Sequence, residues 1–267
     1  MSKVDPKKLR SFGAKVDFGQ TAMDYSTHRA GFPPVFFERL AQRGYLCTGL
    51  HAIDLGTGTG SLARGMAQHG MSVIGVDPAS DLLKEAAKLD HATGVSIRYI
   101  AANAEETGLP NASADLITAG QCWHWFDRPR AATEAARLLK PGGRIVIAHF
   151  DWLPLRGSLA AATEALILRF SPDWAGAGGT GLYPDWLSDL AQAGFDEIET
   201  ASFDVIQTYS HEAWRGRIRA SAGVAASLCT QMVLEFDAEL EALMEMYFPD
   251  DPARLPHRIW WVSAKRP

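Results

Sequence analysis

The sequence predicts an α/β fold in which helices cover both faces of a mostly parallel sheet. Between residues 51 and 150, short apolar segments alternate with segments whose apolar residues recur at helical spacing. A glycine-rich turn follows the first apolar segment, and unusual polar and aromatic residues stand where the later strands should end. Such alternation favours right-handed crossovers and a parallel sheet, which binds ligands beyond the carboxyl ends of its strands.

The expected elements follow in regular order along the chain. The first is a helix over residues 34–43, because Pro34 can occupy the first turn of a helix. Strands are expected over residues 51–55, 72–77, 95–101, 115–120, 144–150, 195–209 and 258–264. Further helices are expected over residues 61–69, 79–89, 128–139, 158–170, 184–193, 211–222 and 234–247. Pro141, Gly142 and Gly143 should break the chain before the fifth strand.

We expect a single domain over residues 1–267, because no linker composition separates two parts of the chain. Its core should comprise about 50–150 together with 195–209 and 258–264. A helical cap should be built from 1–45, 151–190 and 210–250.

Composition and charge limit the class of protein. Hydrophobic residues make up 47% of the chain and charged residues 21%, which are ordinary values for a globular protein. The net charge of -5 argues against nucleic acid as the main partner, since a surface that follows phosphates needs a basic excess. Cys47, Cys122 and Cys229 have neither metal-ligand spacing nor the even number of a disulfide framework, which predicts no metal and a cytoplasmic location. No secretory signal or membrane-spanning segment is expected, because no sufficiently long apolar run occurs.

The glycine-rich turn is the strongest single signal. Gly56, Gly58 and Gly60 follow a buried strand and precede an apolar-periodic helix, so backbone N–H groups should face a ligand at close range. The spacing differs from the G-x-G-x-x-G of dinucleotide-binding dehydrogenases. Asp54 stands two residues before the first glycine, where it would repel a pyrophosphate but suits a ligand that carries an ammonium and a sulfonium.

This stretch, Asp54-Leu55-Gly56-Thr57-Gly58-Thr59-Gly60, resembles the first motif of class I S-adenosylmethionine (SAM)-dependent methyltransferases, (D/E)-x-G-x-G-x-G. Residues 121–126 and 138–143 resemble two further passages of the small-molecule branch, nearest to its ubiquinone-biosynthesis-like and trans-aconitate-methyltransferase-like group. The resemblance covers 50–150 well and the flanks loosely. It implies SAM as cofactor and a Rossmann-like fold with a seven-stranded sheet whose last strand is antiparallel.

The expected cofactor site combines the motif with the ends of later strands. Asp77 can accept both hydrogen bonds from a ribose diol, although Asp before Pro78 also suits a helix N-cap. The resemblance marks Asn103-Ala104-Glu105 as the adenine contact, although Glu105 also suits a solvated helix start. The expected cofactor-binding residues are Tyr25, Arg29, Asp54, Gly56, Thr57, Gly58, Gly60, Asp77, Pro78, Asn103, Ala104, Glu105 and Gln121.

An aromatic run after the fourth strand is expected to line the acceptor pocket. Trp123, His124 and Trp125 can wall a pocket against water, while Trp125 suits core packing equally well. His124 is the candidate general base, with a structural histidine as the alternative. Asp127 is expected as the N-cap of the next helix.

Arg215, Arg217 and Arg219 are a second candidate for contact with the acceptor. They could receive an acidic substrate, although residues two apart do not share a helix face, which favours a solvated face.

These observations favour a methyltransferase that transfers a methyl group from SAM to a small molecule by in-line displacement. A nicotinamide-dependent oxidoreductase is disfavoured by Asp54 and by the glycine spacing. A non-catalytic SAM-binding protein stays open, as do the identity of the methylated atom and the oligomeric state.

Overall fold

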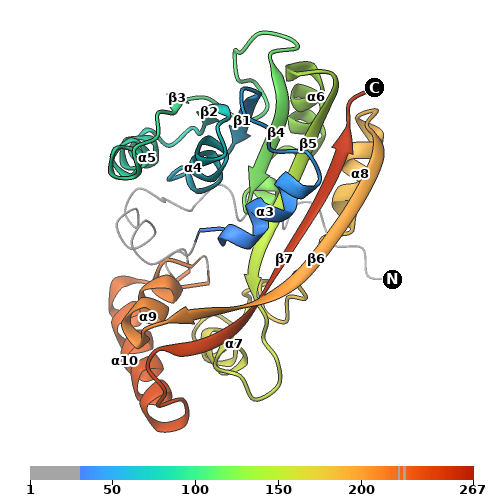
Figure 1. Ribbon diagram of the computed structural model, residues 1–267. Helices are drawn as coiled ribbons and strands as arrows, with labels where there is room; N and C mark the ends of the chain where they lie inside the picture. Colours follow the sequence, from blue (N-terminus) through green and yellow to red (C-terminus); the bar gives the residue numbers. More distant parts are fainter. Residues whose placement is uncertain (1–30, 222, 225–226) are drawn as a thin grey trace. The chain divides into compact units, whose positions relative to one another are not determined.

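Seven strands form one mixed sheet in the computed structural model, which describes residues 31–221, 223–224 and 227–267 (Figure 1). The strands are β1 (His51–Leu55), β2 (Ser72–Val76), β3 (Arg98–Ile100), β4 (Ala114–Gly120), β5 (Leu139–Trp152), β6 (Asp196–Tyr209) and β7 (Ala253–Lys265). Their order across the sheet is β3-β2-β1-β4-β5-β7-β6. The first five strands pair in parallel, while β7 runs against its neighbours (Figure 1). This is the Rossmann-like class I methyltransferase fold expected from the sequence, and its strand order reverses between β1 and β4, where such sheets bind ligands.

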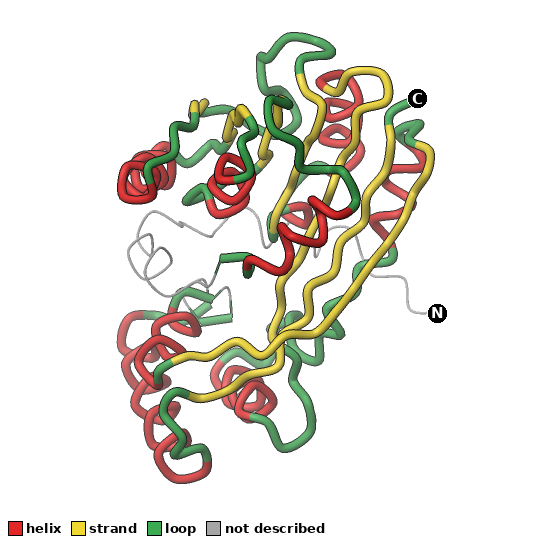
Figure 2. The backbone as a smooth tube through the Cα atoms, viewed as in Figure 1, coloured by secondary structure: helices red, strands yellow, loops and turns green. Residues whose placement is uncertain are grey.

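Helices stand between the strands in the order that the sequence predicts (Figure 2). They are α3 (Pro34–Gln42), α4 (Ser61–Gln68), α5 (Ser80–Thr93), α6 (Arg128–Leu138), α7 (Leu159–Phe170), α8 (Asp185–Gln192), α9 (His211–Arg219) and α10 (Thr230–Tyr247), with a 3-10 turn, η1, at Trp123–Trp125. Local capping sets two of the starts: the Ser158 hydroxyl accepts from the N–H of Ala161 at 3.2 Å, and the Ser210 hydroxyl accepts from that of Ala213 at 3.1 Å.

The expected start of the fifth strand is wrong. Pro141, Gly142 and Gly143 do not separate a helix from the fifth strand, because β5 already begins at Leu139. Ala114 pairs with Leu139 and Leu116 pairs with Arg144, so the Pro-Gly-Gly stretch is accommodated as a bulge inside the strand. The Gly142 N–H donates to the Arg266 carbonyl at 2.9 Å, and the Arg266 N–H donates to the Gly143 carbonyl at 2.8 Å. Pairing with the end of the chain therefore extends β5 beyond what local propensity indicates.

The described chain forms two compact units. One contains Asp151–Gly181 and the described residues of 204–258, and the other contains residues 31–150, Leu182–Phe203 and Ile259–Pro267. The single domain expected from the sequence stays a prediction.

The unit that contains β1 to β4 is built on apolar strands. β1 and β4 are buried along most of their length, as expected for parallel strands with both faces covered. Helix α3 buries Phe36 and Phe37, and the Phe37 ring lies against Gly65 of α4. A Cβ at Gly65 would lie 2.1 Å from the Phe37 ring, so glycine there permits the close approach of the two helices.

In the other unit, α10 packs against α7 and α9. Trp214 of α9 is fully buried, and its indole N–H donates to the Thr163 hydroxyl of α7 at 3.1 Å. That hydroxyl in turn donates to the Leu159 carbonyl at 2.8 Å. The buried Trp214 indole and Thr163 hydroxyl are thus hydrogen-bonded within the unit.

No helix among the described residues combines the length and the apolar character that crossing a membrane requires.

We predict that Gly65→Ala destabilises the protein by about 1–2 kcal/mol, because overpacking against Phe37 outweighs the better helix propensity of alanine. Urea denaturation measures the effect. The matched control is Gln68→Ala, an exposed position in the same helix that should change the unfolding free energy by less than about 0.5 kcal/mol. Equal effects of the two variants would contradict a specific close contact.

Candidate functional site

The glycine loop links β1 to α4 as the sequence predicts. Gly56, Gly58 and Gly60 all have positive φ, at 63°, 54° and 79°. A Cβ at Gly56 would lie 2.8 Å from the Cys122 sulfur, whereas a Cβ at Gly58 would meet no atom within 4 Å. Gly56 therefore packs against the residues that follow β4, and Gly58 faces open space in which a ligand can approach the backbone.

Asp54 lies beneath this loop rather than on its surface. The side chain is 2% exposed, and its two carboxylate oxygens accept from the Thr57 and Thr118 hydroxyls, each at 2.6 Å. Burial raises the pKa of Asp54 to about 6, against the opposing effect of the two hydroxyls. In the described residues Asp54 thus ties the loop to β4, and its direct contact with a cofactor stays a prediction.

Asp77 follows β2 and ties the loop to that strand. Its carboxylate accepts from the N–H of Gly58 at 2.9 Å and from the N–H of Ala79 at 2.9 Å. Burial raises its pKa, while these two N–H groups oppose the shift. The N-cap of α5 is Ala79, so Asp77 is not itself the capping residue, and Pro78 between them is exposed. The carboxylate stands beside the open position at Gly58, as a ribose contact requires.

The stretch after β3 connects to the aromatic run. Ala104 is buried, Asn103 is exposed and Glu105 is half-buried. The Glu105 carboxylate accepts from the N–H of Asp127 at 2.7 Å. Asp127 is the N-cap residue of α6, although its own side chain makes no capping hydrogen bond.

Gln121 marks the end of β4 and carries backbone strain. Its φ is 59°, an uncommon value for a residue other than glycine, and its N–H donates to the Ala148 carbonyl at 2.8 Å. Cys122 follows, and its thiol donates to the Leu55 carbonyl at 3.2 Å. Strained residues of this kind cluster at binding and active sites, which agrees with the role expected for Gln121.

The aromatic run divides between core and surface. Trp123 is fully buried, and its indole N–H donates to the Asp189 carboxylate of α8 at 3.1 Å. Trp125 is half-buried and His124 is exposed. The structure thus gives Trp123 a place in the core, while Trp125 and His124 have surface available for an acceptor.

His149 of β5 is a neighbour of His124 that sequence reasoning missed. Its Nε2 lies 3.4 Å from Nδ1 of His124, and its side chain is 6% exposed. The available signal was its position next to Phe150 at the expected carboxyl end of the fifth strand. Nothing in the local sequence pattern distinguishes it from a packing residue.

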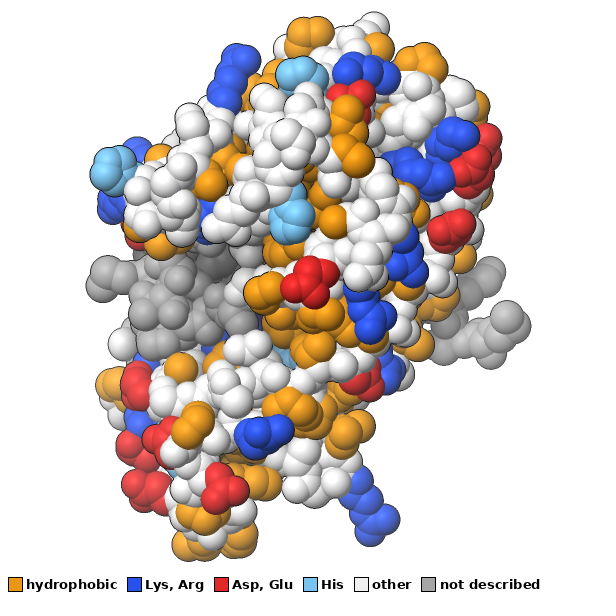
Figure 3. Space-filling model, in the orientation of Figure 1, with side chains coloured by type: hydrophobic (Ala, Val, Ile, Leu, Met, Phe, Trp, Pro, Cys, Tyr) orange, Lys and Arg blue, Asp and Glu red, His pale blue; other side chains and the backbone are white. Residues whose placement is uncertain are grey.

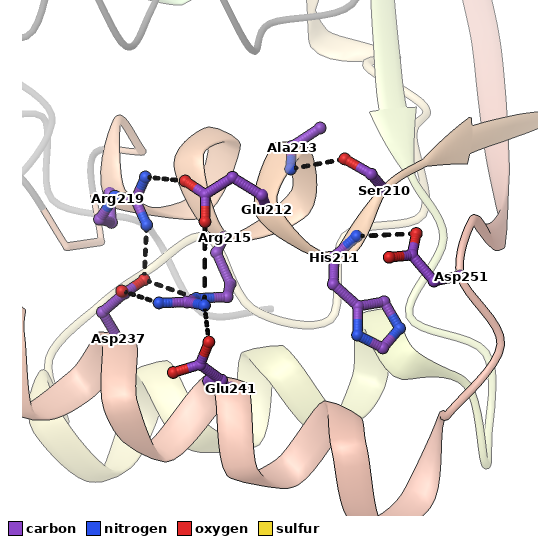
Figure 4. A network of polar contacts seen from close by, with 9 residues as sticks. All are labelled: Ser210, His211, Glu212, Ala213, Arg215, Arg219, Asp237, Glu241 and Asp251. Atoms are coloured by element: carbon purple, nitrogen blue, oxygen red, sulfur yellow. Dashed lines mark hydrogen bonds and ion pairs between the residues drawn. The ribbon is translucent and has the colours of Figure 1, made fainter.

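The three arginines of α9 have different roles. Arg215 and Arg219 both bind the Asp237 carboxylate of α10, Arg219 at 2.8 Å, and Arg215 also pairs with Glu241 (Figure 4). Arg217 is 9% exposed, with its guanidinium carbon 5.1 Å from the centre of the Trp152 ring. The expectation of a solvated face is therefore wrong for Arg217, because α9 turns this residue towards the interior of its unit.

Tyr25 and Arg29 lie outside the described residues. Among the residues that the structure does describe, no three or more His, Cys, Asp or Glu side chains are grouped to hold a metal ion.

We predict that the stability of the protein depends on pH through Asp54. Because its folded-state pKa is raised to about 6, stability is fully present below the unfolded-state value and is lost as the pH rises through about 6. Between about pH 4 and pH 7, wild type should lose up to about 3 kcal/mol of unfolding free energy relative to Asp54→Asn. Urea titrations of both proteins over this range measure the difference, and a constant difference would contradict the raised pKa.

We predict that Asp237→Ala destabilises the unit of α7, α9 and α10 by about 1–3 kcal/mol, because the variant leaves Arg215 and Arg219 without their shared acceptor. Glu241→Ala is the matched control on the same helix. Its carboxylate is half-exposed, so we expect a loss below about 1 kcal/mol. Thermal unfolding of both variants measures the two losses of stability. A larger loss for Glu241→Ala than for Asp237→Ala would contradict the prediction.

Comparison with known proteins agrees with this geometry. The profile of a family described as "Methyltransferase domain" matches residues 53–147, from β1 into β5. An uncharacterized methyltransferase of Mycobacterium tuberculosis is 33% identical over 130 residues, which cover 49% of this chain and 50% of that protein. The ubiquinone biosynthesis O-methyltransferase of Xanthomonas axonopodis pv. citri is 28% identical over 176 residues, which cover 65% of this chain and 72% of that enzyme. The match thus spans about half the length of the mycobacterial relative.

Solved structures show the same fold. A protein of Anaeromyxobacter dehalogenans assigned as a type II methyltransferase aligns with a TM-score of 0.66 at 23% identity, over 89% of this chain and 97% of that chain. Methyltransferases of similar fold have been solved with SAM or S-adenosylhomocysteine bound. These findings show that the chain has the class I methyltransferase fold and that residues 53–147 match a methyltransferase domain.

Proposed function

We propose that this protein transfers a methyl group from SAM to a small-molecule acceptor by in-line displacement. The observation that carries the proposal is the open glycine loop, which Asp54 and Asp77 hold at the carboxyl ends of β1, β2 and β4. This is the position at which an α/β sheet binds its ligand, where strand order reverses.

The residues present fit SAM. Gly58 offers an approach without a side chain, and Asp77 places a carboxylate beside it for a ribose diol. Glu105 is the next candidate cofactor residue along the chain. Its carboxylate accepts a hydrogen bond from the Asp127 N–H, which fixes the position of one carboxylate oxygen. Two acidic side chains that contact the loop, Asp54 and Asp77, suit a cationic ligand better than the pyrophosphate of a dinucleotide.

When bound, SAM supplies a methyl group on a positively charged sulfur, which is already a reactive donor. The protein therefore has mainly to align the acceptor with the methyl carbon and to keep water away. In this proposal Trp125 covers the acceptor and His124 accepts a proton from it, which the exposed surface of both side chains permits. The acceptor's lone pair forms the new bond while the carbon–sulfur bond breaks, and its electron pair stays on sulfur.

The net charge of the chain favours a small-molecule acceptor over a nucleic acid. The chain carries a net charge of -5, and on the face in Figure 3 basic and acidic side chains of the described residues lie interspersed. Binding along a nucleic acid depends on a continuous basic surface. We infer that the aromatic run, together with residues outside the range 53–147 that the family profile matches, chooses the acceptor.

Asp77→Asn should weaken SAM binding at least about tenfold, because an amide cannot supply two charged acceptor oxygens to the loop and the ribose. Calorimetric titration with SAM, S-adenosylhomocysteine and NAD measures this. Asp81→Asn is the control, since Asp81 is exposed in the first turn of the neighbouring helix and should leave affinity unchanged.

Two results would count against the proposal. Well-folded wild-type protein that binds neither adenosyl ligand would remove its basis. Heat released with NAD alone would instead favour an oxidoreductase.

A further inference from the structure

We propose that Glu134 of α6 is a positioning residue for the adenine end of SAM, because it holds the turn that is expected to contact adenine. This turn comprises residues 103–106, where the resemblance to methyltransferases marks the adenine contact. The inference rests on the proposed function and deepens it. It gives a buried carboxylate a part in selecting the base, which the contacts proposed for the glycine loop do not provide.

The turn is closed by its own backbone and leads directly to Thr107. The N–H of Glu106 donates to the Asn103 carbonyl at 3.2 Å, and the two residues form an isolated antiparallel bridge. A backbone bond of this kind fixes the shape of the turn. It does not fix the place of the turn within the unit, which depends on what holds the chain on either side.

Glu134 holds the chain immediately after the turn. Its Oε1 accepts from the N–H of Thr107 at 2.9 Å and from the hydroxyl of the same residue at 2.7 Å. Both residues are buried. The direction of the two hydrogen bonds is fixed, because an ionised carboxylate can only accept. One carboxylate oxygen therefore fixes both the backbone and the side chain of Thr107.

Arg137, one turn further along α6, keeps Glu134 ionised. Its Nε donates to Oε2 of Glu134 and its Nη2 donates to Oε1, each at 2.7 Å, so the pairing is bidentate. Although burial acts in the opposite direction, hydrogen bonds from Arg137 and Thr107 lower the pKa of Glu134 to about 2. Nη1 of Arg137 donates to the Leu109 carbonyl at 2.8 Å, so the same pair also holds the chain beyond Thr107.

The start of the same helix holds the turn itself. Oε1 of Glu105 accepts from the N–H of Asp127, the N-cap residue of α6, at 2.7 Å. Glu134 follows Asp127 by about two turns of helix. Helix α6 therefore fixes the turn at two points, Glu105 within it and Thr107 directly after it.

The position of the turn determines how well adenine is distinguished from other purines. Oε2 of Glu105 is the atom that we expect to accept from the 6-amino group of adenine, and the Ala104 N–H is expected to donate to the ring nitrogen beside it. Hydrogen bonds weaken steeply when their distance or angle departs from the optimum, so displacement of the turn weakens both. The glycine loop contacts other parts of the cofactor. Loss of Glu134 should therefore reduce the preference for adenine.

The test compares S-adenosylhomocysteine with S-inosylhomocysteine, its deaminated analogue, by calorimetric titration. In the analogue an oxygen replaces the amine and the neighbouring ring nitrogen carries a proton, so donor and acceptor are exchanged at both contacts. Wild-type protein should bind the adenosyl ligand at least about tenfold more tightly, because the analogue leaves both groups of the turn without partners. The ratio of the two dissociation constants is the quantity to follow.

Two substitutions at position 134 test the role of the carboxylate. Glu134→Ala should lower the ratio at least about threefold, because Thr107 loses its acceptor. Glu134→Gln should keep the ratio within about twofold of wild type, because the amide oxygen accepts from both donors of Thr107. Thr133→Ala is the control, since Thr133 is exposed on the same helix and its loss should leave the ratio unchanged.

Urea denaturation of the same variants separates positioning from stability. Both substitutions remove the charge that pairs with Arg137, so both should lower the free energy of unfolding, yet only Glu134→Ala should lower the ratio. An unchanged ratio in folded Glu134→Ala would overturn the proposal. Equal losses of the ratio in the alanine and glutamine variants would overturn it as well.

Thr107→Val decides the case if Glu134→Ala does not fold. Valine keeps the N–H and removes the hydroxyl, so the ratio should fall at least about twofold, and an unchanged ratio would overturn the proposal. Wild-type protein that binds both ligands equally would overturn this inference alone. Wild-type protein that binds neither ligand would remove the proposed function as well.

Discussion

The attachment of the glycine loop to three strands is the constraint on which the site depends. A loop of alternating glycines has no side chains of its own with which to hold a shape, and each of its glycines gains freedom in the unfolded chain. Here the hydroxyls of Thr57 and Thr118 bind the two oxygens of Asp54, and the Gly58 N–H binds Asp77. The loop is therefore fixed by carboxylates from the ends of β1 and β2 and by a hydroxyl from β4, which leaves Gly58 open.

Several features at the glycine loop cost folding free energy. Burial of Asp54 and Asp77 raises the pKa of both carboxyl groups, and Gln121 adopts a strained backbone conformation at the end of β4. Apolar strands below the loop bury large side chains and can offset such costs. Under the proposed function, the same acidic groups favour a cationic ligand such as SAM.

Much of the fold was predictable because its signals are local. The apolar alternation placed every strand, and α7 and α9 begin within one residue of their expected starts. The start of β5 was not predictable, because pairing of Gly142 and Gly143 with Arg266 overrides a local turn signal through a contact distant in sequence. The motif residues Asp54, Gly58 and Asp77 were found from spacing. His149 was not, since its neighbour His124 follows a different strand.

The difference between local sequence signals and contacts distant in sequence also explains why the acceptor is harder to identify than the cofactor. The family profile ends at residue 147, within β5, so this profile carries information about the loop but not about α7, α9 and α10. In that unit Arg217 is buried against Trp152, and burial together with the charge of Arg217 lowers the pKa of His257 to about 4. A neutral His257 avoids a second positive charge in the interior of the unit, near that of Arg217. Such an arrangement cannot be read from a spacing motif, because it arises from which face of α9 turns inwards.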